Sequence, residues 1–107
     1  MPKPLAGIRV IELADEKAEY CGLTLAGLGA DVIKIERPKQ GDDTRGWGPP
    51  FLHDDQGQET REAAYYLGAN RNKRSITCDL SRPEGQSLVR ELASQADVLI
   101  ENYKVGD

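Results

Sequence analysis

Two short apolar runs separated by a helix-length segment dominate residues 5–37. The first run covers residues 8–13 (IRVIEL) and the second covers residues 32–35 (VIKI). Both have the length and β-branched composition of strands buried on both faces of a parallel sheet. Parallel strands joined by a helix cross over right-handedly, and ligands lie at their carboxyl ends. The pattern therefore predicts a β-α-β unit whose functional ends are residues 14–17 and 36–37.

The segment between the two runs carries start and stop signals for a helix. Asp15 is a favourable N-cap residue, and Gly29 fits the left-handed position that follows a helix. Apolar residues at helical spacing predict the stripe that packs on the sheet: Ala18, Cys21, Leu25 and Leu28.

A second unit of the same kind is predicted downstream. Residues 75–80 (SITCDL) alternate like a strand, and residues 97–102 (DVLIEN) form another apolar run. The helix between them is predicted to begin with a capping box formed by Ser81 and Glu84, with Pro83 in its first turn. We predict an α/β fold: a Rossmann-like, mostly parallel sheet of about four strands with flanking helices, in the order 3-2-1-4, forming part of a domain.

Residues 38–61 show neither a helical nor a strand period, and their Gly and Pro content predicts a long loop. Such loops are commonly functional or held by another part of the protein. Trp47 and Phe51 either anchor this loop on its own domain or pack against a second domain or subunit. His53 stands beside two aspartates, but consecutive residues rarely converge on one point, so we interpret it as a solvated loop residue. No metal ligand is predicted.

The composition limits the class of protein. A chain of 107 residues forms one domain at most, and 30% charged residues, 38% apolar residues and a net charge of −4 favour a globular domain over a disordered or membrane segment. The acidic balance argues against a nucleic-acid partner. We expect no membrane span and a cytoplasmic location, because the first residues lack the apolar core of a signal peptide. Cys21 and Cys78 are expected to be reduced core residues.

Few residues suggest chemistry directly. The first strand-to-helix turn, ADEKAEY, contains neither the dinucleotide fingerprint GxGxxG nor the phosphate-binding motif GxxxxGK[ST]. Residues 70–74 (NRNKR) are either a solvated edge or a patch that meets phosphates. Arg37, at the end of the second strand, is better placed to bind a phosphate or to stack on an adenine ring.

Four segments occur in a distinctive order: PLAGIRVIELA, LAGLGADVIKIERPKQGDDTRGWGP, NRNKRSITCDL and ADVLIENYKVG. Together they resemble the N-terminal part of the family III CoA-transferases, which include formyl-CoA transferase, carnitine CoA-transferase and α-methylacyl-CoA racemase. The resemblance implies that residues 1–107, with the long loop 38–61, are the N-terminal part of a Rossmann-like domain that binds the nucleotide part of coenzyme A. It also implies CoA thioester and carboxylic acid substrates, no tightly bound cofactor, and an interlocked homodimer at full length.

The resemblance implies a set of residues that contact coenzyme A: Lys17, Ala18, Arg37, Cys78, Asp79, Leu80, Ser81, Asn102, Tyr103 and Lys104. Residues 18–22 depart from the family pattern, because they lack the Gly-Pro pair usual before the first helix. The family's catalytic aspartate falls beyond position 107, so no catalytic residue is expected within this segment. For a complete protein, the resemblance implies ping-pong acyl transfer by a carboxylate nucleophile.

The main hypothesis is therefore the CoA-binding N-terminal portion of a family III CoA-transferase, which moves CoA between an acyl-CoA thioester and a carboxylic acid. One alternative is an acyl-CoA racemase of the same family. Others are a non-catalytic Rossmann-type binding or interaction module and a truncated structural domain. Sequence downstream of residue 107 would distinguish these hypotheses, because only the enzymes require an aspartate-bearing continuation.

Overall fold

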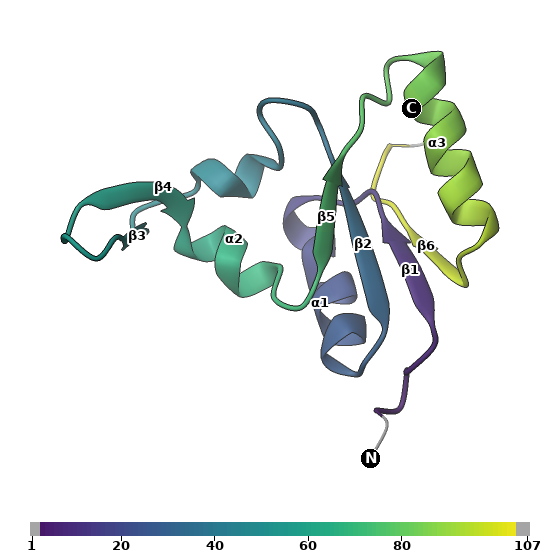
Figure 1. Ribbon diagram of the computed structural model, residues 1–107, viewed down its shortest axis with the longest axis horizontal. Coiled ribbons are helices and arrows are strands. Elements are labelled where there is room, and N and C mark those ends of the chain that lie inside the picture. The colour runs from purple at the N-terminus through teal and green to yellow at the C-terminus, as the bar shows by residue number, and fades with distance from the viewer. Residues whose placement is uncertain (1–2, 105–107) are drawn as a thin grey trace.

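The computed structural model describes residues 3–104 of the chain (Figure 1). In chain order the elements are β1 (Arg9–Glu12), the 3-10 helix η1 (Glu16–Ala18), α1 (Glu19–Gly27), β2 (Asp31–Glu36), the 3-10 helix η2 (Asp43–Gly46), β3 (Phe51–His53), β4 (Glu59–Ala63), α2 (Ala64–Ala69), β5 (Arg74–Thr77), α3 (Pro83–Ser94) and β6 (Val98–Ile100). No helix in this part of the chain is long and apolar enough to cross a membrane.

The main sheet consists of parallel strands in the order β5-β2-β1-β6. This confirms both the predicted four-stranded α/β fold and the predicted order, with β5 and β6 as the third and fourth strands. In register, Val10 lies opposite Val32 on one side and Val98 on the other. The strands β2 and β5 lie on one side of β1, and β6, the last strand in the chain, pairs with its other edge. The switch point of the sheet is therefore beside the end of β1.

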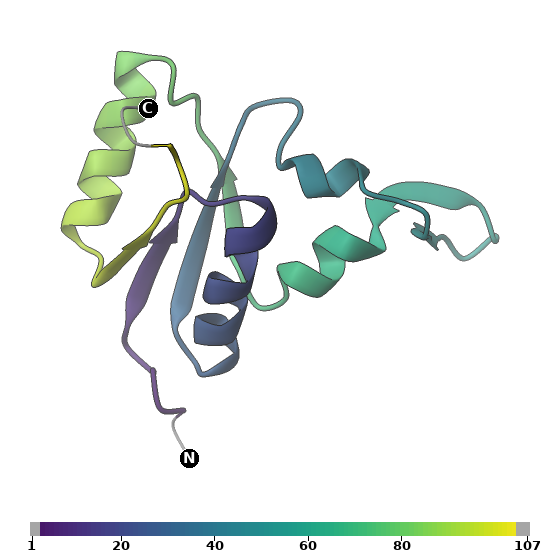
Figure 2. The same ribbon diagram turned by 180° about the vertical axis from the view of Figure 1, so that it is seen from behind.

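Successive strand residues point to opposite faces of the sheet, so both faces are apolar. One helix covers each face. Figures 1 and 2 show α1 and α3 on opposite sides of the sheet. The core under α1 contains Val10, Ala14, Ala26, Ala30, Val32 and Ile100. The core under α3 contains Ile11, Ile33, Ile35, Cys78 and Val89.

The predicted apolar stripe of α1 is half right, because Ala18 and Leu25 pack against the core under this helix. Cys21 and Leu28 are exposed, and the buried residues of this helix are Glu19, Gly22 and Ala26. The helix turns a charged residue toward the sheet because Glu19 finds buried polar partners there. Cys21 is consequently an exposed free thiol rather than a core residue.

The two predicted helix caps at Asp15 and Ser81 are also wrong. Asp15 precedes η1 and makes no side-chain capping bond, while α1 begins four residues later. Ser81 donates its hydroxyl to Asp79 instead, and Arg82 occupies the cap position of α3 without a side-chain bond. The signals that hold are Pro83 as the first residue of α3 and Gly29 with a φ of +107°.

The predicted long loop contains more structure than its composition indicated. Phe51 pairs with Ala63 in an antiparallel hairpin, and η2 precedes it. The turn is closed locally, since the Asp54 side chain accepts bonds from the backbone N–H groups of Gln56 and Gln58. Figures 1 and 2 show this hairpin projecting away from the main sheet.

Trp47, at the base of the hairpin, contacts an aromatic residue of its own domain, and burial of these aromatics against a second domain or subunit stays a prediction. Trp47 meets the Tyr65 ring edge-on, with 4.9 Å between centroids. Both rings nevertheless remain about two-fifths exposed, at 42% and 39%. The helix α2, which carries Tyr65, follows directly after β4.

Candidate functional site

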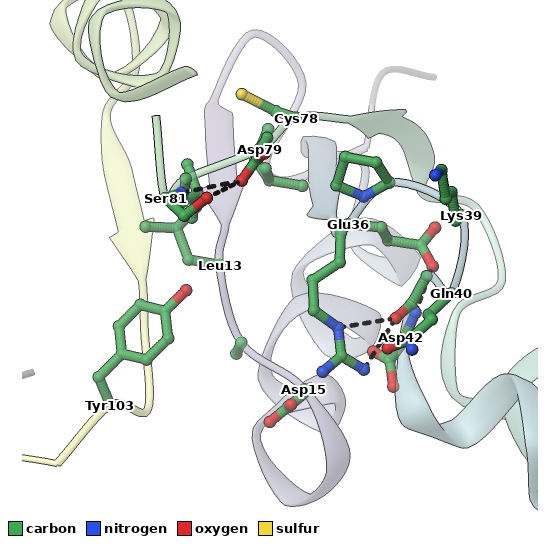
Figure 3. A pocket seen from close by; sticks show the side chains of 16 residues that line it. Leu13, Asp15, Glu36, Lys39, Gln40, Asp42, Cys78, Asp79, Ser81 and Tyr103 are labelled. Atoms are coloured by element: carbon green, nitrogen blue, oxygen red, sulfur yellow. Dashed lines mark hydrogen bonds between the residues drawn. The ribbon is translucent and has the colours of Figure 1, made fainter. Parts of the chain in front are cut away.

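A pocket of about 640 Å³ lies at the carboxyl ends of β1, β2 and β5, the edge at which the sequence predicts a ligand. Three stretches of chain supply most of its wall: residues 13–15 after β1, residues 35–42 around the end of β2, and residues 78–81 after β5. Tyr103 closes the side next to β6 (Figure 3). The pocket is therefore built from turns that a rigid sheet positions.

Six of the ten residues implied by the resemblance line this one pocket: Arg37, Cys78, Asp79, Leu80, Ser81 and Tyr103. Ala18 and Lys104 are described but are not part of its wall. Asn102 does not line the pocket. Its side-chain amide accepts the backbone N–H of Asp15 and donates to the Asp15 carbonyl oxygen. The side chain of Lys17 lies outside the described residues.

Arg37 stands at the mouth of the pocket and is tied back onto the following loop. Its Nε and Nη2 atoms donate to the carbonyl oxygen of Gly41 at 3.1 and 3.0 Å, and Nη2 also pairs with Asp43. The bond to Asp43 raises the pKa of Arg37. The guanidinium is 55% exposed, so an incoming anion can compete with Asp43 in water, where ion pairs are weak.

The turn after β5 is shaped by local hydrogen bonds. Both the N–H and the hydroxyl of Ser81 donate to Asp79 Oδ1, at 3.0 and 2.5 Å, and these bonds lower the pKa of Asp79. Gly85 allows the first turn of α3 to approach this turn closely, because a Cβ there would lie 1.9 Å from the carbonyl oxygen of Asp79. The result is a pocket wall that stays ordered next to the start of α3.

Tyr103 brings an aromatic ring and a hydroxyl to the other side of the pocket. Burial, together with the nearby carboxylates of Asp15 and Glu101, raises the pKa of Tyr103. The phenol therefore stays protonated at neutral pH and is available as a hydrogen-bond donor. Leu13 and Leu80 add apolar surface to the same pocket.

A buried cluster of charged side chains lies beneath the pocket, and the sequence analysis missed it. The ammonium group of Lys34 pairs with Glu12 at 3.0 Å, Glu19 at 3.1 Å and Asp42 at 2.7 Å. Lys73 pairs with the other oxygen of Glu12 at 2.8 Å. We call these five side chains the Lys34 cluster; each is at most 2% exposed.

Burial and mutual contacts perturb the pKa values within the cluster. Burial, followed by the contact with Asp42, raises the pKa of Glu19 to about 7. Burial alone would raise the pKa of Asp42 too, but its hydrogen bonds with Glu19, Lys34 and Thr44 keep that pKa well below its usual range. Burial works against the charged form of Lys34, yet Asp42 and Glu12 raise its pKa. Lys34 is therefore charged, and Glu19 is partly protonated near neutral pH.

A second polar group fixes the loop that carries Asp42. Glu36 accepts two bonds from Arg45, at 2.7 and 2.8 Å, one from the Tyr66 hydroxyl at 3.0 Å, and one from the Ser75 hydroxyl. Burial would raise the pKa of Glu36, but the bonds from Arg45 and Ser75 lower it to about 2. The Glu36 carboxylate also accepts the backbone N–H of Asp42 at 2.9 Å. The loop wall of the pocket is thus anchored to the end of β2.

The basic segment 70–74 is a solvated edge only in part, because Lys73 is buried while Arg74 is exposed. Lys73 belongs to the Lys34 cluster, and Arg74 makes a bidentate pair with Asp31 at the other end of the sheet. Neither side chain lines the pocket. Within residues 3–104, no group of three or more His, Cys, Asp or Glu side chains is arranged to hold a metal ion.

A parallel α/β sheet with a pocket at the carboxyl edge beside its switch point defines the general class, a doubly wound α/β domain, in which ligands commonly lie at this edge. Comparison with known families identifies the particular group. The model of CoA-transferase family III matches residues 5–107, and the chain belongs to that family.

Individual relatives agree with this assignment. The succinate–glutarate CoA-transferase of Agrobacterium fabrum is 59% identical over 102 residues, which cover 94% of this chain and 25% of that protein. The human succinyl-CoA:glutarate CoA-transferase is 45% identical over 105 residues, covering 97% of this chain and 22% of the relative. A CAIB/BAIF family protein from Brucella suis superimposes with a TM-score of 0.87 at 52% identity, covering 99% of this chain and 27% of that one. The chain thus spans about a quarter of the length of its relatives.

Proposed function

We propose that the pocket binds the nucleotide portion of coenzyme A. The chain would then act as the CoA-binding N-terminal portion of a protein that moves CoA between an acyl-CoA thioester and a carboxylic acid. The observation that carries this proposal is the convergence of Arg37, the turn 78–81 and Tyr103 on one pocket in a member of CoA-transferase family III.

The chemistry of the pocket wall supports a nucleotide. Leu13, Leu80 and the ring of Tyr103 offer apolar surface for a planar base. Arg37 and Lys39 supply positive charge on the side of the loop after β2, where phosphates would lie. The wall also carries four carboxylates: Glu36 is paired with Arg45, Asp42 with Lys34, Asp79 lies 3.7 Å from Arg82, and Asp15 accepts from the Asn102 amide. The cations of the loop after β2 therefore belong to a different stretch of the wall from Asp15 and Asp79, which lie on the other two stretches.

The activity of the whole protein extends beyond these residues. We place the carboxylate nucleophile of the transfer reaction outside residues 1–107, so this segment alone is expected to bind CoA weakly and to transfer nothing. The proposal includes a cytoplasmic location and an interlocked homodimer for the full-length protein. The exposed edge strand β6, with Leu99 52% exposed, is apolar surface that further chain could cover.

Arg37→Ala tests the proposal directly. If Arg37 binds a CoA phosphate, its loss weakens CoA binding by about 1.5–3 kcal/mol, the range for a hydrogen bond to a charged group. Arg37→Lys should restore only part, since an ammonium cannot reproduce the fork of the guanidinium. Titration calorimetry with CoA measures both variants, and Arg61→Ala on the distant strand β4 is the matched control. Equal affinity of Arg37→Ala and the parent would remove Arg37 from the site.

A further inference from the structure

Two walls of the pocket meet at one buried ammonium group. Ala14 and Asp15 form the wall after β1, while Gly41 and Asp42 belong to the wall after β2. Lys34 donates from Nζ to the carbonyl oxygen of Ala14 at 3.1 Å and pairs with the Asp42 carboxylate at 2.7 Å. The spacing between the walls therefore depends directly on a side chain that does not itself line the pocket.

The charges around this ammonium do not balance when every group is in its ordinary state. Three carboxylates and two ammonium groups are buried together, which leaves one negative charge without a partner. An uncompensated buried charge costs several kcal/mol. Balance is reached if one carboxyl holds a proton.

Hydrogen-bond geometry locates that proton. Glu19 Oε1 accepts from Lys34 at 3.1 Å and from the Thr44 hydroxyl at 3.2 Å. Glu19 Oε2 is buried and has no hydrogen-bond partner within the described structure, while Asp42 Oδ2 lies 2.7 Å from Lys34 Nζ and makes no further hydrogen bond there. A proton between these two carboxyl groups supplies the missing donor, in agreement with the raised pKa of Glu19.

We propose that Lys34 is a positioning residue for the pocket, and that a proton shared by Glu19 and Asp42 keeps the loop wall in the position seen in the structure. The proton leaves to solvent as the pH rises, and the Glu19–Asp42 pair then carries two negative charges against the single charge of Lys34. Asp42 is the member of that pair at the end of a loop, so its wall moves. The pocket geometry thereby becomes proton-dependent near neutral pH.

The protonation of Glu19 depends on the charged and polar groups that face it, which come from every element packed around it. They are Glu12 of β1, Lys34 of β2, Asp42 and Thr44 of the following loop, and Lys73 before β5. Both lysines favour ionisation of Glu19, whereas the two neighbouring carboxylates and burial oppose it. His53, the one histidine of the chain, lies on the hairpin in β3 and is not part of the cluster.

The first test needs no ligand. Amide hydrogen exchange of the intact chain is followed by NMR between about pH 5.5 and 8.5, because this range brackets the titration of the pair. The amides of Asp42 and Thr44 report on the wall, since they donate to Glu36 and Asp42. Their protection factors are expected to fall at least about threefold toward high pH in the parent. Glu19→Gln, which imitates the protonated side chain, should keep them constant.

Matched controls separate this effect from other titrations. Glu91→Gln changes an exposed glutamate of α3, and His53→Gln removes the histidine, so both should retain the parent's pH profile. Lys34→Met should lower protection of both amides at every pH; if this variant fails to fold, Glu19→Gln still decides the proposal. A parent profile that is flat, or one that Glu19→Gln leaves unchanged, would overturn it.

The second test connects the wall to the proposed ligand and rests on the proposed function. Calorimetric titration with CoA should show affinity falling with pH in the parent and remaining constant in Glu19→Gln. A pH-dependent wall without any CoA binding would reject the proposed function and leave the positioning role intact. CoA binding whose pH profile is identical in the parent and Glu19→Gln would reject the positioning role alone.

Discussion

The two faces of the sheet are buried by different kinds of side chain, apolar on one and partly charged on the other. On the α3 face, Ile11 of β1 and Ile33 and Ile35 of β2 form one continuous apolar layer that packs against Val89. On the α1 face, an apolar core that includes Val10, Val32 and Ile100 shares the sheet with the Lys34 cluster, which lies toward the carboxyl ends of β1 and β2. The first face contributes stability through burial of apolar surface. The second uses directional contacts to hold turns at the pocket, since hydrophobic packing has no such directionality.

The largest expected difference between the faces comes from truncating one buried residue on each. Lys34→Met leaves three buried carboxylates around an apolar side chain and should destabilise the domain by about 3–5 kcal/mol. Ile11→Val on the other face should cost only about 0.5–1.5 kcal/mol. Urea unfolding followed by circular dichroism compares the two. Similar losses for both variants would contradict the distinction.

The α1 face should also make stability depend on pH. The pKa of Glu19 is raised from 4.5 to about 7, so the folded state binds the proton more tightly than the unfolded state. This contribution is fully present below pH 4.5 and is lost as the pH rises to about 7; its size is on the order of 3 kcal/mol. Glu36, with its lowered pKa, acts oppositely and loses its contribution as the pH falls from 4.5 to about 2.

Urea midpoints across this pH range measure the effect. The parent should lose stability between pH 4.5 and 7, and Glu19→Gln should remove most of that slope. A variant on the α3 face, Ile33→Val, should shift the whole curve without changing its slope. A steep slope that persists in Glu19→Gln would assign the titration to another group.

Close packing of α1 against the cluster gives a smaller effect. A Cβ at Gly22 would lie 1.9 Å from Glu12 Oε1, and that carboxylate is fixed by two lysines. Gly22→Ala should therefore destabilise by about 1–3 kcal/mol. Gly27→Ala, on the same helix with open space around it, should be neutral or stabilise by up to about 1 kcal/mol. Thermal unfolding of both variants provides the comparison.

The smallest effect is expected where a charge pair lies in solvent. Arg74 pairs with Asp31 but is 64% exposed, so Arg74→Ala should cost less than about 1 kcal/mol. The adjacent Lys73 is only 1% exposed, and Lys73→Ala should cost several times more, because it leaves Glu12 with one cation. Equal losses at these adjacent positions would show that burial does not set the strength of these pairs.

Local signals in the sequence were reliable where a single segment determines the outcome. The β-branched runs at residues 8–13 and 32–35 became β1 and β2, Gly29 adopts the left-handed conformation, and Pro83 begins α3. The hairpin 51–63 was missed because β3 has only three residues and β4 is largely polar and exposed, so no period marked them. The buried side of α1 was predicted only in part, because Glu19 looks like a surface residue until its partners are known.

The sequence by itself determined the α/β class, the strand order, the family resemblance and the edge of the sheet at which Arg37 and residues 78–81 would meet. Glu12 and Lys34 were visible as charges inside apolar runs, but only the parallel register places them side by side. Asp42 and Glu19 were unremarkable in the sequence, because neither has a partner nearby in the chain. Their meeting on one ammonium group was decided by tertiary structure, since a buried lysine must be surrounded by whichever carboxylates the packed elements bring to it.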